Sequence, residues 1–204
     1  MQEDINFYNH LSALSNGKDK QDKYRQYKNS QDNYCFEMNG DLRQGINISK
    51  WKVECDSLSE IICAKNKTDI VVYRMTSTLE FTPKVDIAIG QGSFRYPAFL
   101  STSRDKKVTF DFVPPFGTPV VLKIKCPIGS LMALMEGSSS SGEQEILLGA
   151  NTEYEIVNVE TVTDSNQLKN HIGVARRDSV IIVEMEIKSN PNVITIPDSD
   201  IFEF

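Results

Sequence analysis

Two glutamates separated by one residue open the stretch GEQEILL, and their carboxylates could transfer protons or stabilise a developing positive charge. Glu143 and Glu145 precede aliphatic residues that are typical of a buried strand. In an extended chain, residues i and i+2 point to the same side, so this spacing predicts two carboxylates side by side. Like charges this close raise each other's pKa and lower stability. On this stretch alone, the simpler interpretation that both face water stays open.

Two further polar groups stand at the ends of apolar segments earlier in the chain. Arg74 closes the run IVVYR, where it could form an ion pair at a strand end or grip phosphate oxygens with both prongs of its guanidinium. Ser101, Thr102 and Ser103 follow the apolar PAFL and could equally form a turn or a helix cap. Neither group identifies a chemistry by itself.

The composition is that of an ordinary globular protein. The 204 residues are 40% hydrophobic and 25% charged, which fits one domain. The net charge of −6 disfavours a general binder of nucleic acid or anionic membranes. The first residues lack the apolar core of a secretory signal, and no apolar run is long enough to span a membrane. We therefore expect a chain that is cytoplasmic as synthesised.

Cysteines and histidines give little support for a metal site or for histidine-based catalysis. No CxxC pairing, and hence no structural zinc, is expected from the four cysteines, which are Cys35, Cys55, Cys63 and Cys126. His10 and His171 lie in polar surroundings and are predicted to be surface or cap residues. Residues 85–95 imitate a dinucleotide fingerprint, but the third glycine and the following helix are missing, which excludes a Rossmann site.

The chain divides into a helical front and a strand-rich remainder. Helical periodicity and caps predict helices over 18–28, 34–45 and 56–67. Short segments rich in β-branched residues predict strands over 70–75, 107–113, 119–126, 131–135, 145–148, 153–162 and 180–187. This segregation predicts an α+β fold, in which N-terminal helices pack on two mainly antiparallel sheets with a sandwich-like core. We expect a single domain over 1–204, with a helical part (1–67), a β-rich core (68–188) and an extended tail (189–204).

The order of the three polar groups, and the elements that carry them, resemble the Arg-Ser-Glu class of toxin-type mono-ADP-ribosyltransferases. The sequence is similar to the enzymatic components of clostridial binary toxins and to related bacterial exoenzymes. The matching segments are DIVVYRM, FLSTS and GEQEILLGANTEYEI, and MNGDLR (38–43) resembles the family's helical Asn-x-x-Leu-Arg segment. Tyr34 stands one residue further from Asn39 than the family spacing, which leaves its role open. The resemblance extends over about residues 34–188.

The resemblance implies cleavage of NAD, as substrate, between nicotinamide and ribose in a cleft of this core, without a metal. A carboxylate beside the ribose lowers the barrier because the departing nicotinamide leaves an oxocarbenium-like cation. Glu145 is implied as that carboxylate, Ser101 as its hydrogen-bond partner and Arg74 as the ligand of the NAD phosphates. The other residues implied at the NAD site are Met75 through its backbone, Thr102, Ser103, Asn39, Arg43, and Phe112 or, as second choice, Phe110 against the nicotinamide.

The resemblance also gives Glu143 a role, because a glutamate two residues before the catalytic one accompanies arginine modification in the family. A guanidinium keeps its proton up to a pKa of about 12 or more, so it needs a carboxylate to orient it and accept the proton. The paired charges of Glu143 and Glu145 would then be tolerated because a cationic substrate lies between them. The preceding loop, GSSSSG (137–142), lacks the aromatic residue usual in the family and is expected to order on the target.

The implied function is a bacterial or phage toxin or effector that modifies arginines of a target protein. Delivery into a target or host cell and an immunity protein or antitoxin as partner are further expectations. Modification of nucleic acid and plain NAD hydrolysis remain as alternatives, and the basic, tyrosine-containing stretch 18–28 is the feature that favours a nucleic acid. We prefer a solvated helix face for that stretch. A non-catalytic binding module on the same scaffold is the second alternative.

Overall fold

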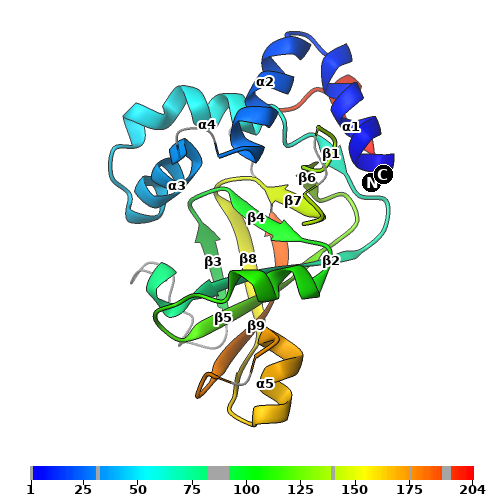
Figure 1. Cartoon of the computed structure of the whole chain (residues 1–204). Coiled ribbons are helices and arrows are strands. Elements are labelled where there is room, and N and C mark those ends of the chain that lie inside the picture. Colours follow the sequence, from blue (N-terminus) through cyan, green and yellow to red (C-terminus); the bar gives the residue numbers. More distant parts are fainter. Residues whose placement is uncertain (1, 31–32, 82–91, 139–140, 175, 190–193) are drawn as a thin grey trace.

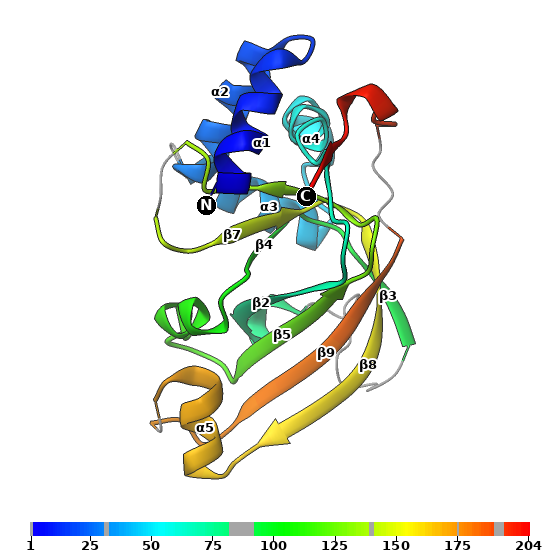
Figure 2. The ribbon, with the colours of Figure 1, turned by 90° about the vertical axis from the view of Figure 1, so that its right-hand side faces the viewer.

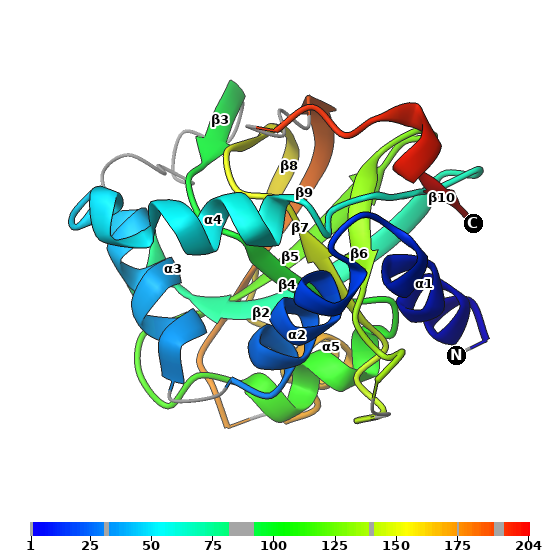
Figure 3. The ribbon, with the colours of Figure 1, turned by 90° about the horizontal axis from the view of Figure 1, so that it is seen from above.

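The helices of the N-terminal part lie together at one end of a β-sheet. The structure is a computed structural model that describes residues 2–30, 33–81, 92–138, 141–174, 176–189 and 194–204. Before the first strand it contains α1 (Gln2–Ala13), α2 (Gly17–Lys28), α3 (Tyr34–Gln44), the 3-10 helix η2 (Ile48–Trp51) and α4 (Lys52–Ser59). Figure 1 and the view from above in Figure 3 show these helices gathered over the strands, whereas α5 (Ser165–Ile172) lies at the opposite end.

Ten strands form one mixed sheet in the order β10-β1-β6-β7-β4-β2-β5-β9-β8-β3. Their bounds are β1 (Ala64–Lys65), β2 (Ile70–Ser77), β3 (Gly92–Tyr96), β4 (Leu100–Ser103), β5 (Pro119–Cys126), β6 (Leu131–Leu134), β7 (Glu145–Leu148), β8 (Thr152–Val162), β9 (Val180–Ser189) and β10 (Phe202–Glu203). Most neighbours are antiparallel, while β1 and β10, and β5 and β9, run parallel.

The expectation of two sheets is wrong, because one residue pair joins what would otherwise be two. Strand β2 pairs with β4 only through Tyr73 and Ser103, whereas it pairs with β5 along its whole length. Figure 2 shows the consequence: β4 and β7 lie near the helices, and β5, β9 and β8 run away from them toward α5. The junction is therefore narrow, and the space beside it is available for a cleft.

Two core clusters hold the layers together. The larger one lies between the N-terminal helices and the nearby strands and includes Phe7, Tyr24 and Leu147, which are fully buried. The smaller one joins the far end of the sheet to α5 and includes Val121 and Ile172. None of the helices in the described part of the chain is long and apolar enough to cross a membrane.

Two elements differ from the sequence prediction because local contacts override the residue pattern. The predicted strand over 107–113 is a 3-10 helix, η5 (Lys106–Phe112), which starts where the Asp105 side chain accepts a hydrogen bond from the Lys107 amide. The predicted helix over 56–67 ends at Ser59; after the partly exposed Glu60, the residues from Ile61 to Ala64 are completely buried on successive positions. A helix buries a stripe on one side and cannot bury every residue in a run. The dinucleotide-like segment 85–95 lies largely outside the described residues.

Three further observations concern segments that the sequence left polar or extended. Tyr24 and Tyr27 of α2 are buried, and the side chains of Lys20 and Lys28 are 10% and 4% exposed, so the expected solvated face covers only part of that helix. The end of the predicted tail forms β10, whose Phe202 ring contacts Phe7 at a centroid distance of 5.7 Å. All four cysteines are free thiols, and burial raises the pKa of Cys63 and Cys126 to about 12.

Tyr24 gives a test of how firmly α2 is fixed to the sheet. Its buried hydroxyl donates to the Leu134 carbonyl at 2.7 Å and accepts from the Gly137 amide at 2.8 Å. Tyr24→Phe leaves both backbone groups without that partner, so we expect the free energy of unfolding to fall by about 1–3 kcal/mol in chemical denaturation. Tyr8→Phe is the matched control: its hydroxyl accepts a bond from the exposed Arg25, and the change should stay within about 0.5 kcal/mol. Equal effects of the two variants would contradict this role of Tyr24.

Candidate active site

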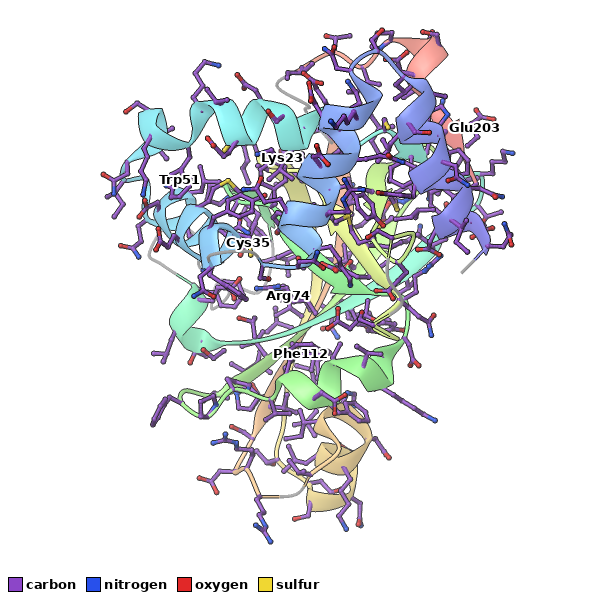
Figure 4. The ribbon with its side chains drawn as sticks, turned by 45° about the horizontal axis from the view of Figure 1, so that its top comes forward. Lys23, Cys35, Trp51, Arg74, Phe112 and Glu203 are labelled. Carbon is purple, nitrogen blue, oxygen red and sulfur yellow. The ribbon has the colours of Figure 1, made fainter. Side chains whose placement is uncertain are left out.

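A cleft of about 400 Å³ lies beside the narrow junction of the sheet. The residues that the sequence predicted for the site all line it: Asn39, Arg43, Arg74, Met75, Ser101, Thr102, Ser103, Phe112, Glu143 and Glu145. They come from α3, β2, β4, η5 and the start of β7. Figure 4 shows Arg74 between the N-terminal helices and the helical turn that carries Phe112.

The pairing of β4 with β7 decides which of the hydroxyl residues share a face with Glu145. Ser103 is directly opposite Glu145, and Ser101 is opposite Leu147. Residues two apart on one strand, and residues directly opposite on its neighbour, lie on the same face of the sheet. Ser101 is thus a diagonal neighbour of Glu145 on that face, within reach of a long side chain.

The other two residues of the hydroxyl triplet bond to the backbone of neighbouring segments. Thr102 is buried, and its Oγ1 donates to the Ile146 carbonyl at 2.8 Å. Ser103 Oγ donates to the Glu143 carbonyl at 2.6 Å and accepts from the Asp105 amide at 2.9 Å. These bonds attach the segment entering β7 to β4 and fix the backbone at both glutamates.

Arg74 is held by a carboxylate that the sequence analysis did not select. Its Nη1 donates to the Ser101 carbonyl at 3.0 Å, and its Nη2 lies 3.1 Å from Glu80 Oε2. Glu80 belongs to η3 (Thr78–Glu80), a 3-10 turn that follows β2 directly. The Nε atom of Arg74 is buried and has no partner among the described residues. A buried donor without a partner is costly, and a ligand oxygen in the cleft would satisfy it.

Glu80 collects several donors besides Arg74. Thr76 and Tyr96 donate their hydroxyls to it, and Arg43 Nη1 lies 3.9 Å from its Oε1. Burial by itself would raise the pKa of Glu80, but the Arg74 charge and the two hydroxyls lower it to about 2. Glu80 is therefore ionised at neutral pH, and it keeps the Arg74 side chain in place beside the cleft.

A chain of hydrogen bonds connects α3 and α2 to the strand that carries Ser101. Asn39 donates to Tyr27 Oη at 3.0 Å and accepts from the Phe99 amide at 3.1 Å. Tyr27 Oη lies 3.4 Å from Ser101 Oγ. Burial raises the pKa of Tyr27 to about 12, so its hydroxyl keeps its proton. Asn39 thus positions Tyr27 and the backbone ahead of β4. Tyr34, whose role the sequence left open, packs against the Tyr27 ring at 6.4 Å.

The two phenylalanines considered for the nicotinamide lie in different surroundings. Phe112 lines the cleft at the end of η5, and 54% of it is exposed. Phe110 packs against the C-terminal end of α5, where a Cβ placed on Gly173 would be 2.9 Å from its ring. Of the two, Phe112 is the one with an exposed ring at the cleft.

Glu143 and Glu145 do not follow the extended geometry expected from their spacing. Gln144 between them has a φ of 48°, in the left-handed region, so the two side chains are not successive same-face residues of a strand. They nevertheless meet, because Lys28 Nζ lies 2.8 Å from Glu143 and 2.7 Å from Glu145. In the free protein Lys28 therefore lies between the two charges, and a cationic substrate near the same pair stays a prediction.

Burial governs the protonation of Glu145. It raises the pKa of this carboxyl above its ordinary value, while the Lys28 charge and hydrogen bonds from Lys28 and Ser101 act in the opposite direction. A carboxyl that is nine-tenths buried in this way needs a nearby positive charge to stay ionised. Lys28 is thus part of the electrostatics of the site.

Sequence reasoning missed Lys28, Tyr27, Glu80 and Glu136, which all contact the predicted residues. Lys28 and Tyr27 belong to a stretch assigned to a solvated face, and the available signal was only that its tyrosines recur at a helical spacing. Glu80 stands six residues after Arg74, and the available signal was an acidic residue close in sequence to an arginine inside an apolar strand. Glu136 directly precedes the segment GSSSSG, and its sequence surroundings carry no signal of a role in the site.

The Glu80 carboxylate makes the stability of the fold depend on pH. Its pKa falls from the ordinary 4.5 to about 2 on folding, so the ionised form contributes about 3 kcal/mol above pH 4.5, and this is lost as the pH falls toward 2. We expect Glu80→Gln to be less stable than the wild type at pH 7, with a difference that shrinks below pH 4.5 in denaturant titrations. Glu184→Gln, which removes the surface pair with Lys123, should show little change at any pH. A pH-independent loss for Glu80→Gln would contradict the assignment.

Comparison with known proteins identifies the family to which the chain belongs. The profile of the ADP-ribosyltransferase exoenzymes matches residues 15–175. Plx2a, an ADP-ribosyltransferase toxin from Paenibacillus larvae, is similar with a TM-score of 0.65 and 19% identity over 92% of each chain. The enzymatic component C2-I of the C2-toxin from Clostridium botulinum has a TM-score of 0.64 and 16% identity, over 91% of this chain and 46% of that one.

A third similar structure is that of C3stau2 from S. aureus with NAD, with a TM-score of 0.59 and 19% identity over 92% of this chain and 95% of that one. A search of curated proteins found no match. At these identities the solved structures show a shared fold, and the family profile covers most of the sequence, including the cleft residues from Tyr27 to Glu145. The chain belongs to the ADP-ribosyltransferase exoenzyme family.

Proposed function

We propose that this protein cleaves NAD and transfers ADP-ribose to arginine side chains of a target protein. The observation that carries the proposal is the meeting of Arg74, Ser101 and Glu145 in one cleft. These residues come from three different strands, and the narrow junction of the sheet brings them together. A cation that binds anions, a hydroxyl and a buried carboxylate are the groups that NAD cleavage requires.

Arg74 is the residue we assign to the NAD phosphates. Its guanidinium is charged, is fixed by Glu80 and the Ser101 carbonyl, and keeps one buried N–H without a partner among the described residues. A fixed guanidinium binds phosphate oxygens with less loss of side-chain entropy than a mobile one. Met75, Thr102, Ser103, Asn39 and Arg43 line the same cleft and complete the proposed NAD site. Phe112 supplies an exposed aromatic ring for the nicotinamide.

Glu145 is the proposed catalytic carboxylate. As nicotinamide leaves with the bonding electron pair, positive charge develops on the ribose, and an ionised carboxylate fixed nearby lowers the energy of that state. Ser101, a diagonal neighbour on the same face of the sheet, is the residue we assign to orienting this carboxylate. Because the side chain is only 12% exposed, water screens its charge weakly.

Glu143 is the residue we assign to the acceptor. Its side chain is 39% exposed, considerably more than that of Glu145, so it can meet a group that arrives from solvent. A carboxylate in this position binds a guanidinium in two-pronged fashion and accepts its proton as the new bond to the ribose carbon forms. The acceptor is therefore proposed to be arginine.

Two of the alternatives from the sequence, a nucleic-acid acceptor and a non-catalytic binding module, receive less support. Tyr24 and Tyr27 are buried, so neither offers a free ring to stack on a nucleic-acid base, and the exposed face of α2 mixes Asp22 with Lys23 and Arg25. A binding module without catalysis would have no use for a pair of crowded, partly buried glutamates. We further propose that the protein acts as a bacterial or phage toxin or effector inside a target cell, with an immunity protein or antitoxin that protects the producer.

Replacement of the catalytic carboxylate should abolish chemistry and spare the fold. We expect Glu145→Gln to lower the rate of nicotinamide release from NAD by about 100- to 1,000-fold, because the neutral amide no longer stabilises the ribose cation. Glu160→Gln, an exposed glutamate on β8, is the control and should retain the wild-type rate. The proposed catalytic role is abandoned if Glu145→Gln releases nicotinamide as fast as the wild type.

Replacement of Glu143 should separate the transfer of ADP-ribose from the cleavage of NAD. We expect Glu143→Gln to lose transfer of labelled ADP-ribose to agmatine and to lysate proteins, and to retain most of the NAD hydrolysis, because the guanidinium loses its base while the ribose keeps Glu145. Digestion of the labelled lysate with protease should remove the label, and digestion with nuclease should leave it. Label that resists protease but not nuclease would instead support a nucleic-acid acceptor.

A further inference from the structure

Lys28, the last residue of α2, makes four contacts at the end of the cleft. Its Nζ atom lies 2.7 Å from Glu136 Oε1, 2.8 Å from Glu143 Oε2, 2.7 Å from Glu145 Oε2 and 3.0 Å from Ser141 Oγ. One ammonium thus binds three carboxylates that lie 108 to 117 residues away in sequence.

The cluster of Lys28 with Glu136, Glu143 and Glu145 has little exposure to water on the side of α2. The side chains of Lys28 and Glu136 are 4% and 5% exposed, while exposure increases through Glu145 to Glu143. The ammonium therefore approaches the carboxylates from the protein side. Glu143 and Glu145, which both line the cleft, each contact Lys28 through Oε2, which leaves Oε1 of both carboxylates for other partners.

The three carboxylates would otherwise have the geometry of a cation site. One oxygen from each of Glu136, Glu143 and Glu145 lies within 4.8 Å of the others. Lys28 Nζ is within hydrogen-bond distance of all three, so a covalently attached cation already fills the position that an ion would take. Three negative charges and one positive charge leave two negative charges in the cluster.

The remaining groups that face Glu145 are neutral hydroxyls. Tyr24 and Tyr27 lie on α2 near this carboxyl, and burial raises the pKa of both phenols. Ser101 approaches from β4, and Ser141 belongs to the loop that leads to Glu143. Lys28 is thus the positive charge that faces Glu145 within the described part of the chain.

We propose that Lys28 is a positioning residue that keeps Glu145 ionised and aligned with Glu143, and that the charge left over in the cluster attracts a cationic acceptor. The inference rests on the proposed function, since it concerns the ionisation of the proposed catalytic carboxylate. In this proposal two cations act at the site in turn. The Lys28 ammonium is there in the free protein, and the acceptor guanidinium binds afterwards from the cleft. An opposite charge within about 4–6 Å lowers the pKa of a carboxyl by about 1–3 units.

The first test is the pH profile of nicotinamide release. In Lys28→Met the acid limb of kcat/KM should move to higher pH by about 1–3 units, because Glu145 loses its counter-charge. In Glu136→Gln the limb should move to lower pH, because Lys28 is then shared by fewer carboxylates. Lys20→Met is the matched control: Lys20 is also a buried lysine on α2 and pairs with Glu60 at 2.7 Å outside the cleft. Its loss should lower the thermal midpoint and leave the pH profile unchanged.

Carboxyl ¹³C shifts of glutamate-labelled protein give a readout that does not need activity. The Glu145 resonance, identified by its absence in Glu145→Gln, should titrate at higher pH in Lys28→Met and at lower pH in Glu136→Gln than in the wild type. If Lys28→Met does not fold, the downward shift in Glu136→Gln still tests the idea. An unchanged Glu145 titration in both variants overturns the inference. A wild type that releases no nicotinamide refutes the proposed function and leaves the ¹³C test of Lys28 valid.

Discussion

One row of backbone pairs holds the site together. Tyr73 of β2 is opposite Ser103 of β4, and Ser103 is opposite Glu145 of β7. Arg74 follows Tyr73 directly, so the same row that joins two parts of the sheet also sets the distance between the arginine and the glutamate. Pairing in β-sheets has a period of two, and a slip of one residue would turn each side chain to the other face. The positions of these site residues therefore depend on this register.

Two ion pairs lie near this row of backbone pairs. Each compensates a functional charge that is largely removed from water. The Arg74 side chain is 23% exposed and pairs with Glu80, and the Glu145 side chain is 12% exposed and pairs with Lys28. A charge that is largely removed from water is costly without a partner, so each ion pair lowers the cost of placing a functional charge beside the cleft. In both systems the partner is deeper or more enclosed than the face toward the cleft. The protein thus presents one positive and one negative functional group a short way apart without letting them neutralise each other.

Much of the strand pattern was predictable, and the reason is visible in the residues. Strands β2, β5, β7 and β9 are nearly continuous apolar and β-branched runs, and Arg74 is a charged residue inside one of them. The predictions that failed depended either on a long-range residue pair or on a local backbone conformation that the residue types did not reveal. The prediction of two sheets failed on one bridging pair, the strand over 107–113 on a cap from Asp105, and the extended geometry at Glu143 on the left-handed Gln144. Lys28 was invisible because its partners lie more than a hundred residues away.

The buried thiols have a consequence for the surroundings in which the fold can persist. Oxidation and disulfide exchange proceed through the thiolate, and burial keeps Cys55, Cys63 and Cys126 protonated, with pKa values of about 11 to 12. No cross-link contributes to the native state, since all four cysteines are free. The same native structure is therefore compatible with reducing and oxidising compartments alike, as long as the core stays closed. A passage that unfolds the chain would expose four reactive sulfurs together, and the redox state at the moment of refolding would then decide how much protein regains its shape.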